Sequence, residues 1–323
     1  MSGVRRLLIL AIALVLLPSA SARSSANRPV ALVAAETSNQ VIAVSLGPQG
    51  GHVLRRVQLV DPLMVAAPLH GPAVVLSPAT GTVTLLAWHS LRPVKVLRGF
   101  RDPQVARIAP GDRFAYVADG GTGDLTVIDL EQRRIVDRIY VGAGAHHMSF
   151  SPDGKRLWIA LSEVATTIVR LDTSNLRRPR LAARLHPRFP SHSIGFAPDG
   201  DTVWVSSARA RYVTVYNAAT AHIVKVIPAA RAPQEVAFSG ARVLLTSGYG
   251  SSLQAVLWRT YRRLGTVPMP YGSFNLATFS GQVVTSSLFT GQVVELEAGT
   301  LRRLWTTKVA PATRYVAISL WPR

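Results

Sequence analysis

From residue 29 onward, the chain is a succession of short segments in which apolar and polar residues alternate. The clearest example lies in residues 145–172, where Met148 and Phe150 alternate with Ser149, the period of two that is typical of a β-strand. A Pro-Asp-Gly sequence at 152–154 follows, and it favours a tight turn because glycine accepts the positive φ that such a turn requires. Two further apolar runs of strand length, rich in β-branched residues, come after this turn. The stretch therefore predicts three strands.

The same pattern recurs along the chain with a period near 40 residues. We take as the marker of each unit the small residue just after the large apolar residue of its first strand. The markers are Ala67, Ala109, Ser151, Ala197, Ser239, Ser280 and Ser319. Successive markers are 42, 42, 46, 42, 41 and 39 residues apart. Four short strands repeated at this period are typical of a β-propeller. The seven markers predict an all-β fold, a seven-bladed β-propeller with four-stranded blades.

The first unit has only three predicted strands, at 30–34, 41–46 and 53–60, and lacks a preceding inner strand. The alternating segment 315–319 supplies the missing strand from the other end of the chain. We therefore expect the C-terminal strand to complete blade one and close the ring, which removes the open sheet edges of a linear array. Residues 23–323 are predicted to form one propeller domain.

Large and small residues alternate along the predicted inner strands. Met148 and Phe150 are large and Ser149 is small, and Gly195 and Ala237 hold the small position in the next two blades. Because blades converge towards the axis, one face of a blade must be small where the large residues of its neighbour insert.

Two segments carry a resemblance to a known family. Residues 150–160, Phe-Ser-Pro-Asp-Gly-Lys-Arg-Leu-Trp-Ile-Ala, and residues 116–119, Tyr-Val-Ala-Asp, resemble the YVTN-repeat propellers, exported bacterial proteins close to the lactonase-like propellers. The likeness covers nearly all of the chain after the first 22 residues, although Ala118-Asp119 stand where Thr-Asn would be. The resemblance implies the fold and a binding or surface role, while a few related propellers are enzymes.

The N-terminus has the pattern of a secretory signal peptide. Arg5 and Arg6 precede an apolar run at 7–17, and Ala-Ser-Ala at 20–22 is a small-x-small cleavage sequence. We predict cleavage after residue 22, which leaves 301 of the 323 residues, and secretion or a periplasmic location. An uncleaved anchor is the alternative, against which the shortness of the apolar run argues. The chain has no cysteine, which excludes disulfides, thiolate metal sites and a lipidated cysteine.

The net charge of +19 favours anionic partners. Alignment of the blades places pairs of arginines at the last hairpin of five blades. They are Arg55, Arg56, Arg133, Arg134, Arg177, Arg178, Arg262, Arg263, Arg302 and Arg303. These arginines either lie in solvated turns of an arginine-rich sequence or together form a basic disc that binds a polyanion. The polyanion would be an envelope polymer, anionic lipid or nucleic acid. Few aromatic residues lie among them, which gives base stacking little support.

A second set of polar residues occupies one repeated position, four residues before the large apolar residue of an inner strand. These residues are Gln104, His146, His192, Gln234, Asn275 and Arg314. His147, Asp102 and Glu235 are adjacent to members of this set. Ring closure would gather them around the channel mouth, either as a site for a small anionic or polyhydroxylated ligand or as a solvated pore rim. Two histidines from neighbouring blades are too few for a metal site, so we predict neither a metal nor a cofactor.

Motifs for catalysis are absent from the sequence. There is no G-x-S-x-G elbow and no H-E-x-x-H zinc motif. Related lactonase-type propellers place several carboxylates at the axis, whereas this rim combines amides, imidazoles and a guanidinium. We therefore expect an exported binding or scaffold protein of the cell envelope, with a ligand or protein partner at the channel mouth or on the basic face. A lactonase-like or other hydrolase with its site at the channel mouth is the alternative.

Overall fold

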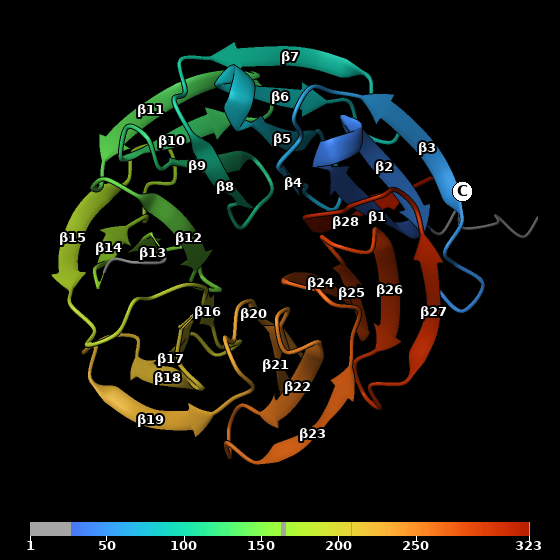
Figure 1. Ribbon diagram of the computed structural model, residues 1–323. Coiled ribbons are helices and arrows are strands. Elements are labelled where there is room, and N and C mark those ends of the chain that lie inside the picture. Colours follow the sequence, from blue (N-terminus) through green and yellow to red (C-terminus); the bar gives the residue numbers. More distant parts are fainter. Residues whose placement is uncertain (1–26, 163–165, 208, 323) are drawn as a thin grey trace, which may run out of the picture.

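The computed structural model describes residues 27–162, 166–207 and 209–322. Seven four-stranded antiparallel sheets stand around a central axis (Figure 1), as the repeat period predicted. Two 3-10 turns, η1 (Glu36–Ser38) and η2 (Pro78–Thr80), are the helical elements of the described part of the chain. Among these residues, no helix has the length and hydrophobicity needed to cross a bilayer.

Strands follow one another from the channel outward in six of the blades. Blade two contains β4 (Met64–Ala66), β5 (Ala73–Ser77), β6 (Thr82–Leu86) and β7 (Pro93–Arg98). Blade three contains β8 (Pro103–Ile108), β9 (Phe114–Asp119), β10 (Asp124–Asp129) and β11 (Arg134–Tyr140). Blade four contains β12 (Ala145–Phe150), β13 (Arg156–Leu161), β14 (Ile168–Asp172) and β15 (Arg180–Leu185). Blade five contains β16 (Ile194–Phe196), β17 (Thr202–Ser206), β18 (Tyr212–Asn217) and β19 (Ile223–Pro228). Blade six contains β20 (Val236–Ser239), β21 (Arg242–Ser247), β22 (Ser252–Leu257) and β23 (Arg263–Pro268). Blade seven contains β24 (Asn275–Phe279), β25 (Gln282–Ser286), β26 (Gln292–Glu297) and β27 (Arg303–Lys308).

Blade one joins the two ends of the chain, which confirms the predicted closure. Its strands are β28 (Val316–Trp321), β1 (Arg28–Ala35), β2 (Gln40–Ser45) and β3 (Val53–Gln58). The inner strand β28 pairs antiparallel with β1 over six residues, with Val30 opposite Ser319. The predicted signal peptide, residues 1–22, lies outside the described residues.

Neighbouring blades are joined by a repeated aromatic contact. A large ring on the second strand of one blade meets, edge to face, a phenylalanine on the inner strand of the next. The pairs and their centroid distances are Tyr116–Phe150 at 4.8 Å, Trp158–Phe196 at 6.0 Å and Trp204–Phe238 at 6.1 Å. Such T-shaped pairs add to the free energy of simple burial. The repeat therefore specifies not only the strands but also the contact between blades.

The alternation of large and small residues on the inner strands has the expected consequence. A Cβ atom added at Gly195 would lie 2.9 Å from Val236 Cγ1 and 3.1 Å from Phe238 Cε2, both on the inner strand of the next blade. Blade five therefore has no side chain at position 195, which leaves room for the large residues of blade six.

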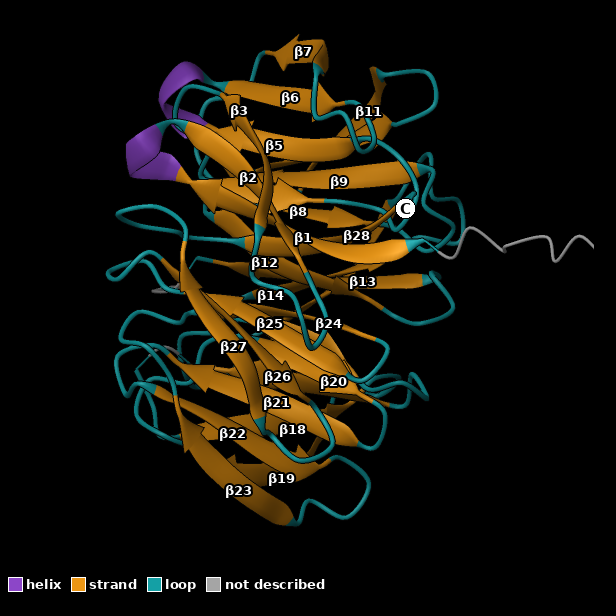
Figure 2. Ribbon diagram, turned by 90° about the vertical axis from the view of Figure 1, so that its right-hand side faces the viewer, coloured by secondary structure: helices purple, strands orange, loops and turns teal. Residues whose placement is uncertain are grey.

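The two faces of the disc carry different loops (Figure 2). We call top the face that carries the loops into the inner strands and the loops between second and third strands; η1 and η2 lie on it. The opposite, or bottom, face carries the first and last hairpin of each blade. Figure 1 looks onto the top face.

Candidate functional site

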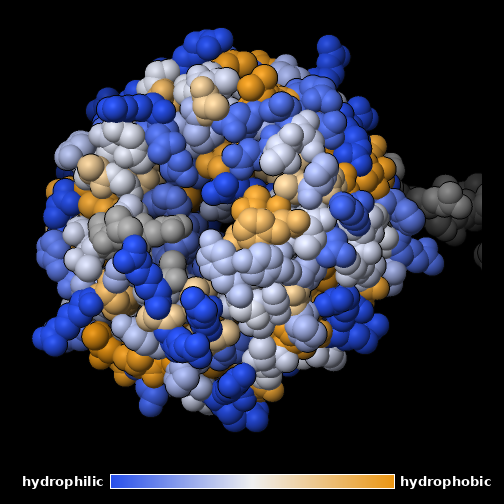
Figure 3. Space-filling view, in the orientation of Figure 1, coloured by the Kyte–Doolittle hydropathy of each residue, from blue (hydrophilic) through white to orange (hydrophobic). Residues whose placement is uncertain are grey.

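The polar residues of the repeated rim position line one cavity at the top of the channel. Its volume is about 330 Å³. It is lined by Gln104, His146, His147, His192, Gln234, Asn275 and Arg314, together with Arg209 and several apolar residues. Figure 3 shows the central hollow of this face, surrounded mostly by hydrophilic side chains. All seven residues that the sequence assigned to a rim site therefore line one cavity, although they come from six different blades.

Hydroxyl groups at the ends of second strands hold the rim in place. Ser206 Oγ donates a hydrogen bond of 2.6 Å to the carbonyl of Gln234, in the next blade. Thr246 Oγ1 makes the corresponding 2.6 Å bond to the carbonyl of Phe274. Each bond ties the loop that carries a rim residue to the neighbouring sheet, so the rim is a rigid part of the ring.

Asp119, from the Tyr-Val-Ala-Asp segment, does the same for the loop before Gln104. Its buried carboxylate accepts hydrogen bonds from the backbone N–H groups of Arg101 at 2.7 Å, Asp102 at 2.9 Å and Gly121 at 3.0 Å. Several N–H donors on one carboxylate fix the backbone around it. The motif that carries the family resemblance is thus structural in this blade.

Part of the rim's hydrogen-bonding capacity is used within the protein. Gln104 Nε2 donates to Asp102 Oδ1 at 2.5 Å, and Gln234 Oε1 accepts the N–H of Gly248 at 3.2 Å. These contacts orient the two amides, and each leaves the other polar atom of its amide group outside the bond.

Other rim atoms are buried without a protein partner. Asn275 Nδ2 donates to the carbonyl of Arg314, but Asn275 Oδ1 has no partner among the described residues. His147 Nδ1 is likewise buried and without one. A buried polar atom that lacks a partner costs free energy, which a ligand or water with the complementary group recovers. Both residues line the cavity.

The three histidines form a tilted stack at one side of the cavity. The ring of His147 lies between the other two, with centroids 4.4 Å from His146 and 4.2 Å from His192. Burial, and then the proximity of the other two imidazoles, holds the pKa of His147 well below its usual range. It is therefore neutral at physiological pH. Within residues 27–162, 166–207 and 209–322, no group of three His, Cys, Asp or Glu side chains is arranged to hold a metal ion.

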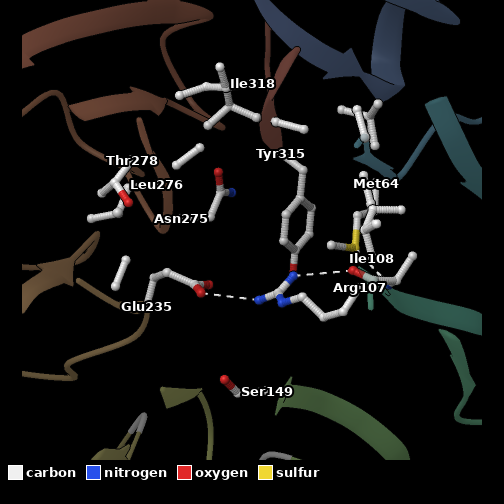
Figure 4. A pocket seen from close by; sticks show the side chains of 18 of the residues that line it. Met64, Arg107, Ile108, Ser149, Glu235, Asn275, Leu276, Thr278, Tyr315 and Ile318 are labelled. Atoms are coloured by element: carbon white, nitrogen blue, oxygen red, sulfur yellow. Dashed lines mark hydrogen bonds and ion pairs between the residues drawn. The ribbon is translucent and has the colours of Figure 1, made fainter. Parts of the chain in front are cut away.

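An ion pair lies across the axis, between Glu235, which lines the top cavity, and Arg107, which lines the second cavity of the channel. Arg107, on β8, places Nη2 3.1 Å from Oε1 of Glu235, which precedes β20 three blades away (Figure 4). Tyr315 points towards the same guanidinium. Burial raises the pKa of Glu235, while the charges of Arg107 and His192 act against that rise. Below this pair the channel continues as a second cavity of about 370 Å³ between the inner strands.

Sequence reasoning noted Glu235 but missed Arg107. The sequence pattern that could have identified Arg107 is a break in the repeat. Arg107 occupies the inner-strand position that is Ser149, Gly195 and Ala237 in the next three blades. An arginine at a position reserved for small side chains must extend into the channel. Arg209 was also missed, because its loop is specific to blade five.

The arginines assigned to the last hairpins belong to them, either at the turn or in the outer strand. Arg55 and Arg56 lie within β3, the outer strand of the last hairpin of blade one. The other eight lie at turns between third and fourth strands or at the first residue of the fourth strand. These residues are Arg133, Arg134, Arg177, Arg178, Arg262, Arg263, Arg302 and Arg303.

Acidic residues share this face. Arg113 Nη2 lies 3.1 Å from Asp129 Oδ2 and 3.7 Å from Glu131 Oε2, and Arg302 Nη2 lies 3.7 Å from Glu297 Oε2. The bottom face therefore carries carboxylates beside its arginines, and polyanion binding there stays a prediction.

Comparisons with known proteins identify the fold alone. No protein-family model matches the chain, and no curated protein matches it. Among solved structures, a functionally unknown protein from Desulfotomaculum acetoxidans is similar with a TM-score of 0.77 and 15% identity, over 91% of this chain and 99% of that one. The chain is a seven-bladed β-propeller. Kuenenia stuttgartiensis hydrazine synthase matches this propeller with a TM-score of 0.70 and 18% identity, over 81% of this chain and 90% of that one. Identities this low carry no inference about activity.

Proposed function

We propose that this chain is an exported propeller of the YVTN-repeat type that binds a small anionic, hydroxyl-bearing ligand in the top cavity. The observation that carries the proposal is the convergence of the polar rim on one cavity, where Asn275 Oδ1 and His147 Nδ1 are buried without a partner among the described residues. A cavity of about 330 Å³ is at the lower end of the usual range for small-molecule sites.

The balance of charge favours an anion. Two arginines line the cavity, and one of them, Arg314, is paired with a carboxylate, Glu36, at 3.2 Å. Arg107, which lines the second cavity, is paired with Glu235. Arg209 forms no ion pair with a described residue. One uncompensated guanidinium beside amides and imidazoles suits a ligand with one carboxylate or phosphate and several hydroxyl groups.

A hydrolase is the second candidate, because Glu235 is buried and its pKa is raised, which is typical of a general acid or base. Its ion pair with Arg107 counts against this role by stabilising the carboxylate. Measured turnover of simple lactones that is lost in Glu235→Gln would favour the enzyme.

The export part of the proposal rests on the N-terminal sequence pattern. It predicts that protein recovered from the periplasm or medium of a producing bacterium begins at Arg23. N-terminal sequencing of that material decides between cleavage and an anchor.

A thermal-shift screen tests the ligand proposal. The probes are organic acids, sugars, sugar acids, lactones and divalent metal ions, applied to the protein without its first 22 residues. We expect sugar acids or hydroxy acids to raise the Tm of the wild type and to have little effect on Arg209→Gln. Arg303→Gln, on the bottom face, is the control and should respond like the wild type. Equal responses of all three proteins to every probe would refute a site in the cavity.

A further inference from the structure

A cluster of aromatic side chains borders the cavity on one side. Tyr249, Tyr271 and Phe289 are 55%, 48% and 50% exposed, and Phe274 is half-buried among them. They belong to three top-face loops of blades six and seven. Half-exposed aromatic rings that gather in one place are unusual on a monomer's surface and mark binding sites.

The rings form one continuous surface, which we call the aromatic platform. Tyr271 and Phe289 stack with centroids 4.9 Å apart and an interplanar angle of 21°. Phe274 meets Tyr249 at 4.8 Å and Phe289 at 5.8 Å, in both cases edge to face. The aromatic platform is therefore held by its own packing and presents the remaining ring faces to solvent.

Glycines let the rings lie flat against the loop backbone. An added Cβ at Gly272, whose φ is +88°, would lie 2.5 Å from Phe289 Cδ2. At Gly248 it would overlap the ring of Phe274. These close approaches pre-organise the rings, so little side-chain freedom is lost when a ligand stacks on them.

The aromatic platform is continuous with the polar cavity, because Tyr249 and Phe274 line both. A ligand that enters the cavity and is longer than it must pass over these rings. Such a ligand needs a flat apolar face for the rings, hydroxyl groups for the rim and one negative charge near Arg209. Sugar units combine an apolar C–H face with an edge of hydroxyls, and a uronic acid adds the carboxylate.

We propose that the cavity and the aromatic platform together bind an acidic oligosaccharide, with one uronic acid unit in the cavity and the following units stacked on the platform. This inference rests on the proposed function and names its ligand class. A folded protein partner fits the site less well, because a flat apolar surface would leave the buried Asn275 Oδ1 and His147 Nδ1 without partners.

Isothermal titration with three sugars tests the inference: galacturonic acid, its linear trimer and neutral maltotriose. We expect the trimer to bind about tenfold more tightly than the monomer, as one good stacking contact would provide. Maltotriose lacks the carboxylate and should bind more weakly than the acidic trimer.

Two variants separate the aromatic platform from the cavity. Tyr271→Ala with Phe289→Ala removes the stacked pair, which does not line the cavity, and should reduce trimer affinity to that of the monomer while monomer affinity stays unchanged. Arg209→Gln should weaken both. Tyr140→Ala removes a 62% exposed tyrosine on the outer strand β11 and is the matched control, which should bind like the wild type.

The outcomes distinguish the two proposals. If the monomer binds and the trimer binds no more tightly, or if the platform variant leaves trimer affinity unchanged, the oligosaccharide inference is overturned and the small-ligand function stands. If none of the sugar acids and none of the organic acids binds the wild type, the proposed function fails and the inference with it. If the platform variant instead abolishes self-association seen by analytical ultracentrifugation, and the trimer does not compete, the aromatic platform is a protein interface and the inference is wrong.

Discussion

Replacing Arg107 by methionine should destabilise the protein by removing the partner of a buried carboxylate. The side chain of Glu235 is only 9% exposed and that of Arg107 27%. Breaking a buried ion pair by deleting one partner costs about 3–5 kcal/mol, and the partial exposure of Arg107 places this case near about 3 kcal/mol. For a domain of this size, that corresponds to a fall in Tm of about 6 °C.

The effect should depend on pH, because it acts through the carboxyl of Glu235. Burial raises the pKa of this group above its ordinary value of 4.5, so the folded state binds its proton more tightly than the unfolded state. The contribution of this tighter proton binding to the free energy of unfolding is fully present below pH 4.5 and is lost as the pH rises through the pKa of Glu235 in the folded state. Without Arg107, the pKa rises further and the loss at neutral pH is larger. Acidification should therefore reverse most of the destabilisation.

A double-mutant cycle isolates this pair from general acid effects. The free energy of unfolding is measured by urea denaturation for wild type, Arg107→Met, Glu235→Gln and the double variant, at pH 8 and pH 5. Arg107→Met should be the least stable at pH 8, and the double variant should recover about 2 kcal/mol because no buried charge remains. At pH 5 the difference between these two should shrink. A difference that is absent at pH 8, or equal at both values, would refute the electrostatic account.

Three further predictions follow from the packing and the surface. Deleting residues 316–323 removes β28 and should abolish cooperative unfolding or soluble expression, and a truncated protein that melts like the full chain would contradict the observed closure. Gly195→Val should lower the free energy of unfolding by about 1–3 kcal/mol without changing the circular dichroism spectrum, because its side chain collides with blade six; unchanged stability would mean that the blades separate easily. Replacing six arginines of the bottom face by glutamine should leave Tm nearly unchanged. If this face binds polyanions, heparin binding by the variant should weaken and lose its salt dependence, whereas undiminished binding would exclude these residues. The six are Arg133, Arg134, Arg177, Arg178, Arg262 and Arg263.

The architecture was accessible from the sequence because a repeat fold is specified locally. Each unit of about 40 residues carries its own alternation of apolar and polar residues and its own marker position, so the blade number and the closing strand could be predicted without long-range information. The polar rim could be predicted for the same reason. A position that recurs in every blade must lie at the same height around the axis.

Only the tertiary structure determined what the rim residues contact. The pairing of Arg107 with Glu235 spans residues 128 apart in sequence, and the aromatic platform joins three loops that differ from blade to blade. Neither the ion pair nor the aromatic platform follows the repeat, so no periodic pattern in the sequence predicts them. Side chains that depart from the pattern meet at the axis because the ring closes. Their partners are therefore set by geometry that no local sequence pattern encodes.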